Sequence, residues 1–219
     1  MLTLHYWPGY CSLATHIVLR WISVPYRLQL ADHAMRQSGG FKQLNPSSTV
    51  PVLVDEDGWV LSQNVAVLNY LAEQHPQARL SGDDARSRAH VNRWLGYINS
   101  DVHKAFSPLM HPERLPGDQA AQRQALDNAK ATLRKHFGVL DEPLREHAWI
   151  AGERRSIADP YLFVLTRWAR AKGVDLSGLE GVATHFDRMS ADPEVQAALA
   201  EEGLAGSDLA ARPDPEETR

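Results

Sequence analysis

The sequence is poor in cysteine: Cys11 is the only one among 219 residues. A single cysteine excludes an intrachain disulfide framework, and this fits a reducing compartment. Long apolar runs are also missing, since none approaches the roughly 18 residues that a membrane helix needs. The first residues start a strand pattern and lack the charged and apolar regions of a secretory signal. We therefore expect a cytoplasmic protein that does not engage a membrane.

The chain has no excess of positive charge either. It carries 23 Lys and Arg against 27 Asp and Glu, a formal net charge of −4. The basic residues are scattered, so a nucleic-acid partner is not expected. The histidines are spread along the chain without a His-Glu-x-x-His motif, and one cysteine cannot form a Cys-x-x-Cys pair. No metal site is predicted.

Three motifs that mark large enzyme classes are absent from the sequence. It has no Gly-x-Ser-x-Gly nucleophile elbow, no phosphate-binding Gly-x-x-x-x-Gly-Lys loop and no Gly-x-Gly-x-x-Gly turn. These absences argue against the hydrolases, nucleotide hydrolases and dinucleotide-dependent enzymes that depend on them.

The first third of the chain has an α/β pattern. Residues 2–7 alternate as a strand, a helical pattern follows to about Ser23, and residues 26–30 alternate again. A strand–helix–strand unit implies parallel pairing with a right-handed crossover. Residues 32–49 are polar and contain Gly39-Gly40 and Asn45-Pro46, which predicts a loop that could include a short helix.

A hairpin and a helix are predicted to follow. Apolar runs at residues 51–54 and 59–61 flank Asp55-Glu56-Asp57-Gly58, and Asp-Gly between two apolar runs is a strong hairpin signal. Ser62-Gln63-Asn64 then leads into a helical stripe that His75-Pro76 ends. The first 76 residues thus read βαβ followed by ββα, which predicts an α/β domain over residues 1–76.

Beyond a linker at residues 77–84 the pattern is helical throughout. Apolar stripes with helical spacing cover residues 91–102 and 126–140. Ser156-Ile157-Ala158-Asp159 has the form of a helix-capping box, and shorter helices are expected around residues 182–189 and 195–199. We predict an all-α domain over residues 85–205. The last residues, 206–219, have no apolar face and are predicted to be disordered.

Cys11 has a placement that suits thiol chemistry, at or just inside the start of the first helix. Unpaired backbone N–H groups and the helix dipole favour an anion there, so they should lower the pKa of the thiol. Cys11 could then be a nucleophile or could hold the sulfur of a partner. Its placement is equally compatible with a small buried hydrophobe. A thioredoxin-like dithiol relay would need a second cysteine at position 14, which is Ala14, so redox chemistry must take its second thiol from a small molecule.

Two other features could contact a ligand. A cis bond between Val50 and Pro51 would turn the Val50 backbone outward to pair with a peptide-like molecule, although a trans bond in a simple loop is the default. Gln63-Asn64 lies at a helix start, where N–H groups could hold a carboxylate. The alternative is that Asn64 or Ser62 only caps the helix.

These motifs together resemble a known family. The N-terminal ones are Pro8-Gly9-Tyr10-Cys11-Ser12-Leu13, Asn45-Pro46, Val50-Pro51-Val52-Leu53, and Val65-Ala66-Val67 through Tyr70-Leu71-Ala72. The later ones are Val102-His103-Lys104, Ser107-Pro108-Leu109, Ile157-Ala158-Asp159-Pro160-Tyr161-Leu162-Phe163 and Pro193-Glu194-Val195. In this order they make the chain similar to glutathione S-transferases of the bacterial, cysteine-containing beta class, from Leu4 to about Leu204.

The resemblance implies a thioredoxin-like domain and an all-helical domain, paired in a homodimer, that binds glutathione as co-substrate and serves in detoxification. Cys11 and His103 would be the catalytic residues. The implied glutathione-binding residues are Cys11, Arg36, Val50, Pro51, Gln63, Asn64, His103 and Lys104. The implied wall for an apolar electrophile is formed by Tyr10, Phe106 and Trp168, with core packing as the alternative role of Trp168.

Four positions depart from the family pattern. Asn64 and Gly96 stand where members of the family commonly carry other residues at the glutathione site. The loop at residues 33–40 is shortened, and Arg36 is the nearest basic residue for the glycine carboxylate of the ligand. Arg155 stands where an apolar residue usually precedes the capped helix, which concerns stability alone.

Three functions are compatible with this sequence. The leading hypothesis is a glutathione transferase that conjugates the tripeptide to apolar electrophiles, exchanges thiol and disulfide through Cys11, or does both. The departures motivate an alternative, a non-catalytic binder of glutathione conjugates or apolar molecules on the same scaffold. A dedicated dehalogenase or isomerase that uses glutathione cannot be told from the first by sequence.

Overall fold

The computed structural model describes residues 1–204; the predicted disordered tail lies outside them. The chain begins with β1 (Leu2–Tyr6), α1 (Ser12–Ile22) and β2 (Tyr26–Leu30). β1 and β2 pair in parallel with Leu2 opposite Tyr26, so the predicted strand–helix–strand unit is confirmed. The helix ends at Ser23, whose left-handed backbone closes the last turn.

The sheet is completed by β3 (Val52–Val54) and β4 (Val60–Ser62), and its strand order is β2-β1-β3-β4. Both new pairings are antiparallel, which confirms the predicted hairpin. The carboxylate of Asp55 accepts hydrogen bonds from two backbone N–H groups of the turn. Gly58 closes that turn at φ +82°, a conformation that suits glycine.

The region between β2 and β3 contains more helix than the predicted loop with one possible short helix. It forms two short helices, α2 (His33–Gln37) and α3 (Gly39–Leu44). Asp32 accepts a hydrogen bond from Met35 N at 2.7 Å, and Ser38 accepts one from Phe41 N at 3.2 Å. Each helix therefore has a side-chain cap. Phe41 is buried in a small apolar cluster with Trp7 and Val52, and this contact, which is remote in sequence, holds the segment against the sheet.

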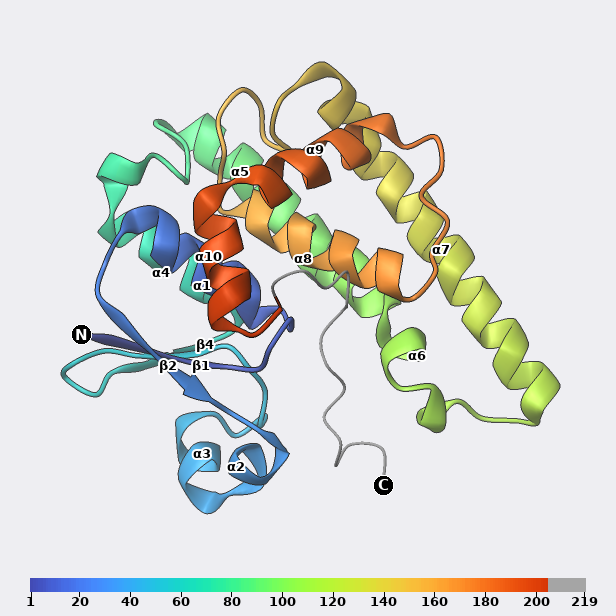
Figure 1. The fold of residues 1–219 in the computed structure, drawn as a ribbon, viewed down its shortest axis with the longest axis horizontal. Coiled ribbons are helices and arrows are strands. Elements are labelled where there is room, and N and C mark those ends of the chain that lie inside the picture. The colour runs from blue at the N-terminus through green and yellow to red at the C-terminus, as the bar shows by residue number, and fades with distance from the viewer. Residues whose placement is uncertain (205–219) are drawn as a thin grey trace.

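The helix α4 (Asn64–Gln74) follows the hairpin. Figure 1 shows α1 and α4 between the sheet and the later helices, with α2 and α3 beyond the opposite side of the sheet. The apolar faces of the two helices pack on Leu4 and Leu53 of the sheet, and Leu13, Ile17 and Leu68 are fully buried there. This packing brings the N-terminal ends of α1 and α4 close to the C-terminal part of the chain.

The rest of the described chain is helical, as predicted. Its helices are α5 (Ala85–Tyr97), α6 (Ser107–Met110), α7 (Gln119–Glu146), α8 (Ala158–Ala171), α9 (Glu180–Ala191) and α10 (Pro193–Glu201). Single 3₁₀ turns cover Pro76–Ala78 and Pro112–Arg114, and a π-helical segment, Ile98–His103, continues α5. π-helical turns are rare and are often found at functional sites.

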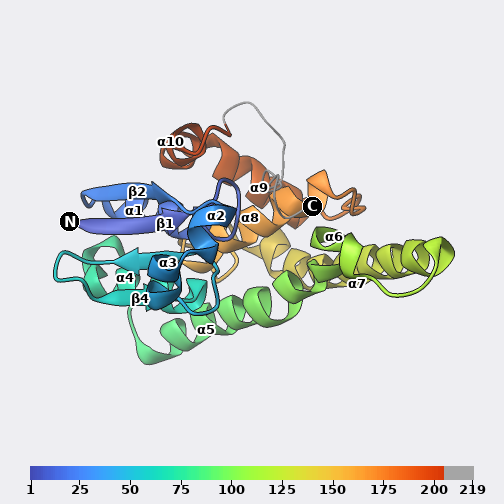
Figure 2. The ribbon, with the colours of Figure 1, turned by 90° about the horizontal axis from the view of Figure 1, so that it is seen from below.

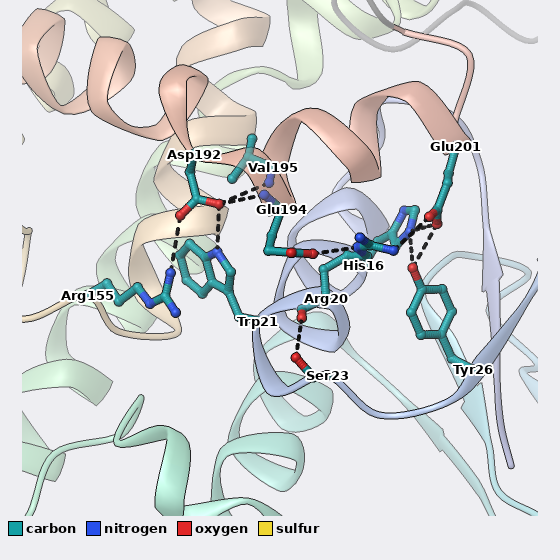
Figure 3. A network of polar contacts seen from close by, with 10 residues as sticks. All are labelled: His16, Arg20, Trp21, Ser23, Tyr26, Arg155, Asp192, Glu194, Val195 and Glu201. Atoms are coloured by element: carbon teal, nitrogen blue, oxygen red, sulfur yellow. Dashed lines mark hydrogen bonds and ion pairs between the residues drawn. The ribbon is translucent and has the colours of Figure 1, made fainter.

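The start of α8 contains the predicted capping arrangement in modified form. Asp159 is fully buried and accepts hydrogen bonds from the N–H and hydroxyl of Ser156. Ser156 in turn accepts from the N–H of Ala158 at 3.3 Å. Before this turn, Arg155 lies over the ring of Trp21 at 4.5 Å and pairs with Asp192, as Figure 3 shows. A cation–π contact therefore stands where an apolar contact was expected.

One apolar core joins the two parts of the chain. α1 packs against both α8 and α10, and its buried residues belong to the same cluster as Leu162 and Val195. Figure 2 shows α10 beside the α1–β2 layer, far from the outer end of α7. Among the described residues, no helix combines the length and apolar character needed to cross a membrane.

Candidate functional site

Cys11 caps the N-terminus of α1, as the sequence predicts. Its thiol donates a hydrogen bond to the carbonyl oxygen of Val50, with Sγ and O 3.3 Å apart. The Val50–Pro51 peptide bond is cis, so the trans alternative is excluded. The turn before the helix is fixed by the buried hydroxyl of Ser12, which bonds to both the N–H and the carbonyl of Trp7. Cys11 and Val50, which lie 39 residues apart in the sequence, thus meet at the cysteine sulfur.

The expectation of a lowered thiol pKa is wrong. Burial raises the pKa of Cys11 to about 12, although the backbone N–H groups of Cys11 and Ser12 lower it. Removal of water destabilises a thiolate more than two N–H dipoles stabilise it here. Cys11 is therefore a neutral thiol, and its S–H donates a hydrogen bond to the Val50 carbonyl oxygen.

The peptide unit of Gly9, just before Cys11, is held from the C-terminal part of the chain on both sides. Trp168 Nε1 donates to the Gly9 carbonyl at 2.8 Å. The Gly9 N–H donates to the carboxylate of Glu202, also at 2.8 Å. Gly9 has φ +74°, which suits glycine at this turn. Two residues 34 positions apart in the helical part thus fix the loop that presents the thiol.

Glu202 is itself part of a polar network between α1 and the end of α10. His16 lies between two carboxylates, 3.0 Å from Glu202 through Nδ1 and 2.9 Å from Glu201 through Nε2. The Tyr26 hydroxyl also donates to Glu201, and Figure 3 shows His16, Tyr26 and Glu201 converging from α1, β2 and α10. Burial raises the pKa of Glu202, and His16 opposes that effect.

His103 approaches this turn from the helical part. Its ring lies edge-on to Trp168, with ring centroids 5.0 Å apart, and Trp168 bonds to Gly9 as described. Burial lowers the pKa of His103 to about 4, so the imidazole is neutral at pH 7. In the protein without ligand, His103 therefore does not carry the positive charge that the sequence suggested for stabilising a thiolate. A neutral imidazole can accept or donate a single proton.

The hydroxyl of Tyr161 is a further polar group in this region that the sequence pattern did not single out. It lies 2.6 Å from His103 Nδ1 and donates to Asn99 Oδ1 at 3.0 Å. Burial raises the pKa of Tyr161, and a charge on Cys11 would raise it further, so the phenol and the thiol are within electrostatic reach. Tyr161 belongs to the buried face of α8. In an apolar sequence pattern, a tyrosine that acts in a site looks the same as a tyrosine that only packs, so the sequence does not identify it.

Gln63 and Asn64 differ in their surroundings. Gln63 is exposed, precedes α4 and has φ +75°, a conformation that costs a non-glycine residue about 1–3 kcal/mol. Asn64 is 5% exposed and accepts a hydrogen bond from the Thr15 hydroxyl at 2.9 Å. Its Nδ2 is buried without a well-formed hydrogen bond, yet close enough to Tyr161 to oppose, in part, the burial that raises the pKa of that phenol. Neither side chain caps α4.

The remaining predicted residues are placed as follows. Arg36 is 7% exposed, donates from Nε to the carbonyl of Ala31 and lies 5.9 Å above the ring of Trp7. Lys104 is exposed at the end of the π-helical segment.

Phe106 is fully buried against Trp168, edge to face. Tyr10 is partly buried, and its ring contacts that of Trp7 edge-on. Within residues 1–204, no three His, Cys, Asp or Glu side chains gather as metal ligands.

The comparisons with known proteins agree with this geometry. Residues 10–74 match the family model "Glutathione S-transferase, N-terminal domain", and residues 97–193 match "Glutathione S-transferase, C-terminal domain". The chain is 46% identical over 198 residues to glutathione S-transferase GST-4.5 of Xanthomonas campestris pv. campestris, across 90% of this chain and 97% of that protein. The chain belongs to the glutathione S-transferase family.

Solved structures of this family are similar over almost their whole length. The glutathione S-transferase from Xylella fastidiosa is 43% identical with a TM-score of 0.90, across 93% of this chain and all of that one. A sphingomonad glutathione S-transferase complexed with glutathione is 33% identical with a TM-score of 0.82 at the same coverage. The beta-class enzyme of Sphingomonas chungbukensis is 35% identical with a TM-score of 0.79, again at that coverage. The resemblance to the beta class is thereby confirmed.

Proposed function

We propose that this glutathione S-transferase conjugates the thiolate of glutathione to small apolar electrophiles. The observation that carries the proposal is the meeting of Cys11 at the start of α1, Val50 before a cis proline, and the neutral imidazole of His103 beyond Trp168. A tripeptide sulfur beside Cys11 would face the N–H groups of a helix start, which stabilise an anion. The relative solved with glutathione supports this choice of co-substrate.

The binding residues in this proposal follow the family pattern. The Val50 backbone would pair with the cysteinyl part of glutathione, and Gln63 with Asn64 would take its γ-glutamyl end at the start of α4. The strained backbone of Gln63 supports that role, because such strain is concentrated at ligand sites. Lys104 and Arg36 would be the cations that pair with the remaining negative charge of glutathione. Residues 1–76 would thus form the glutathione-binding domain.

The helical part, residues 85–205, would supply the wall for the electrophile. Tyr10 would line this pocket, whereas Phe106 and Trp168 are buried and would support it from the core. The edge-on contacts of Trp168 with Phe106 and with His103 support this arrangement, since they anchor the imidazole to the core.

The state of the Cys11 thiol favours conjugation over thiol–disulfide exchange. An exchange reaction needs Cys11 as a thiolate, and a thiol whose pKa is raised to about 12 keeps its proton at neutral pH. A neutral thiol can instead donate a hydrogen bond to the thiolate of the ligand. Cys11 would then stabilise the nucleophile without becoming one.

Replacement of the cysteine tests this function. We expect Cys11→Ala to keep conjugation of glutathione to a dinitroaryl chloride within about tenfold, the range of one weak hydrogen bond. Reduction of a glutathione mixed disulfide should be slow in the native enzyme and about equally slow in the variant, because Cys11 is not its nucleophile. Disulfide reduction that survives intact in the variant would exclude Cys11 as the redox centre. A native enzyme that gains about 305 Da on Cys11 and loses conjugation with the replacement would contradict the proposed role.

Binding and assembly are measured separately. Calorimetry of the native protein should detect glutathione; no heat at about 10 mM ligand, which corresponds to less than about 2.7 kcal/mol of binding free energy, would favour the non-catalytic binder. We also propose that the protein is a cytoplasmic homodimer that detoxifies electrophiles. Sedimentation velocity should give twice the mass of one chain.

A further inference from the structure

The Tyr161 hydroxyl lies between the two parts of the site, the start of α4 and the π-helical segment after α5. Tyr161 is 1% exposed on α8, while its two hydrogen-bond partners, Asn99 and His103, belong to the π-helical segment after α5. These partners are four residues apart, so both side chains reach the same side of the segment. Asn64, at the start of α4, adds an amide nitrogen near the phenol from the glutathione-binding side.

The hydrogen-bond directions around this phenol determine where His103 carries its proton. A phenol has one proton to donate, and the Tyr161 hydroxyl donates it to Asn99 Oδ1. The contact of 2.6 Å with His103 is too short for two lone pairs to face each other. His103 must therefore donate from Nδ1–H to the phenol oxygen. In a neutral imidazole the other nitrogen, Nε2, then has a lone pair.

We propose that Tyr161 is a positioning residue that holds His103 in the Nδ1–H tautomer, so that Nε2 serves as the base for the thiol proton of glutathione. This inference rests on the proposed function and extends it. Nε2 has no hydrogen-bond partner among residues 1–204, whereas Nδ1 is committed to Tyr161. The edge-on contact with Trp168 fixes the plane of the imidazole.

The proton transfer is balanced without another reactant. The S–H bond of glutathione breaks, its electron pair stays on sulfur, and the proton moves to Nε2 to give an imidazolium, whose charge the adjacent thiolate stabilises as an ion pair. The thiolate then forms the C–S bond while the leaving group departs with its bonding pair, and the imidazolium releases the proton to water. A His103 held in the opposite tautomer would present N–H to the thiol and could not take this proton.

The chain offers a matched control for such a pair. Tyr97 and His136 form the same kind of contact, with the hydroxyl 2.8 Å from Nδ1 and the rings edge to face. This second pair lies between α5 and α7, and within residues 1–204 it shares no hydrogen bond with residues 7–11, the thiol turn. Tyr97→Phe therefore removes an equivalent phenol from the same helical part without a change at the proposed base.

The first experiment reads the tautomer directly. Nitrogen NMR of the native protein, labelled at histidine and assigned by comparison with His103→Gln, should show Nδ1 of His103 protonated and Nε2 bare at pH 7. In Tyr161→Phe the two tautomers should mix, while Tyr97→Phe leaves His103 unchanged. A native His103 with its proton on Nε2 overturns the inference. This reading needs no substrate, so it stands apart from the proposed function, which fails if the native protein neither binds nor conjugates glutathione.

The second experiment separates positioning from packing. Tyr161→Phe should lower kcat for conjugation by about tenfold or more, part of the 10²–10⁴-fold that a positioned base supplies, with little change in KM for glutathione. Tyr97→Phe should stay within about twofold. In the His103→Gln background, Tyr161→Phe should cost less than about twofold, because the base it positions is gone. An equal loss in both backgrounds would show that Tyr161 acts on packing alone.

Discussion

At the scale of single residues, Cys11 shows two opposing effects on one proton. The N–H groups at the start of α1 favour a thiolate, whereas burial favours the thiol, and burial is the larger effect. The acceptor of the thiol proton, the carbonyl of Val50, also favours the neutral form. A cysteine at a helix start is therefore not by itself a reactive cysteine.

The alkylation rate of Cys11 measures the balance between its thiol and its thiolate. Between pH 7 and 9 the folded protein should react with iodoacetamide at least 100-fold more slowly than the same chain in urea, because a pKa of about 12 leaves far less thiolate than the ordinary value near 8.5. The rate should still rise tenfold per pH unit above pH 9, where the unfolded chain has reached its plateau. A folded-state plateau near pH 7 would show a low pKa instead.

At the scale of elements, the start of α8 depends on one buried carboxylate. Asp159 accepts hydrogen bonds from Ser156, from the N–H of Ile150 at 2.9 Å and from His185 Nε2 at 3.1 Å. It therefore ties the helix start to the preceding turn and to α9. Asp118, by contrast, caps the exposed start of α7 through one bond to Ala121 N.

These two caps should differ in their effect on stability. Asp159→Ala leaves several buried donors without an acceptor and should lower the free energy of unfolding by about 3–5 kcal/mol. Asp118→Ala removes one exposed cap and should cost about 1 kcal/mol. Urea unfolding followed by fluorescence measures both. Similar losses in the two variants would show that Asp159 acts as an ordinary cap.

At the scale of the whole molecule, the thiol turn belongs to both parts of the fold. Gly9 is bonded to Trp168 on α8 and to Glu202 just after α10, so the helical part fixes the position from which Cys11 acts. Glu201 and Glu202 are neighbours that both contact His16. Only Glu202, the buried one of the two, accepts a hydrogen bond from Gly9.

The different burial of Glu201 and Glu202 allows a paired test of the contact between the N-terminal part and the helical part. Glu202→Ala leaves the Gly9 N–H and His16 Nδ1 buried and unpaired, and should lower the free energy of unfolding by about 2–4 kcal/mol. Glu201→Ala removes a partly exposed partner and should cost less than about 1 kcal/mol. Under conditions where both variants are folded, Cys11 should be alkylated faster in Glu202→Ala alone. Equal alkylation rates would show that the turn holds its position without Glu202.

Local patterns sufficed for most of the elements. Alternation predicted β1 and β2, Asp-Gly predicted the β3–β4 hairpin, and apolar spacing predicted α1, α4 and the helices of the second part. Each of these signals acts over a few neighbouring residues, so it can be read along the chain. The placement of Cys11 at a helix start, and the resemblance to the glutathione S-transferase family, came from the same kind of local information.

Tertiary structure decided what depends on residues far apart. Phe41 holds the α2–α3 segment against the sheet by packing with Trp7 and Val52, and burial among distant elements reversed the expected direction of the Cys11 pKa shift. The contact of Tyr161 with His103 joins residues 58 positions apart. The sequence alone thus determined the order and kind of elements, because backbone preference and apolar periodicity are local. The protonation and orientation of the site arose only on folding, because desolvation and hydrogen-bond partners are set by long-range contacts.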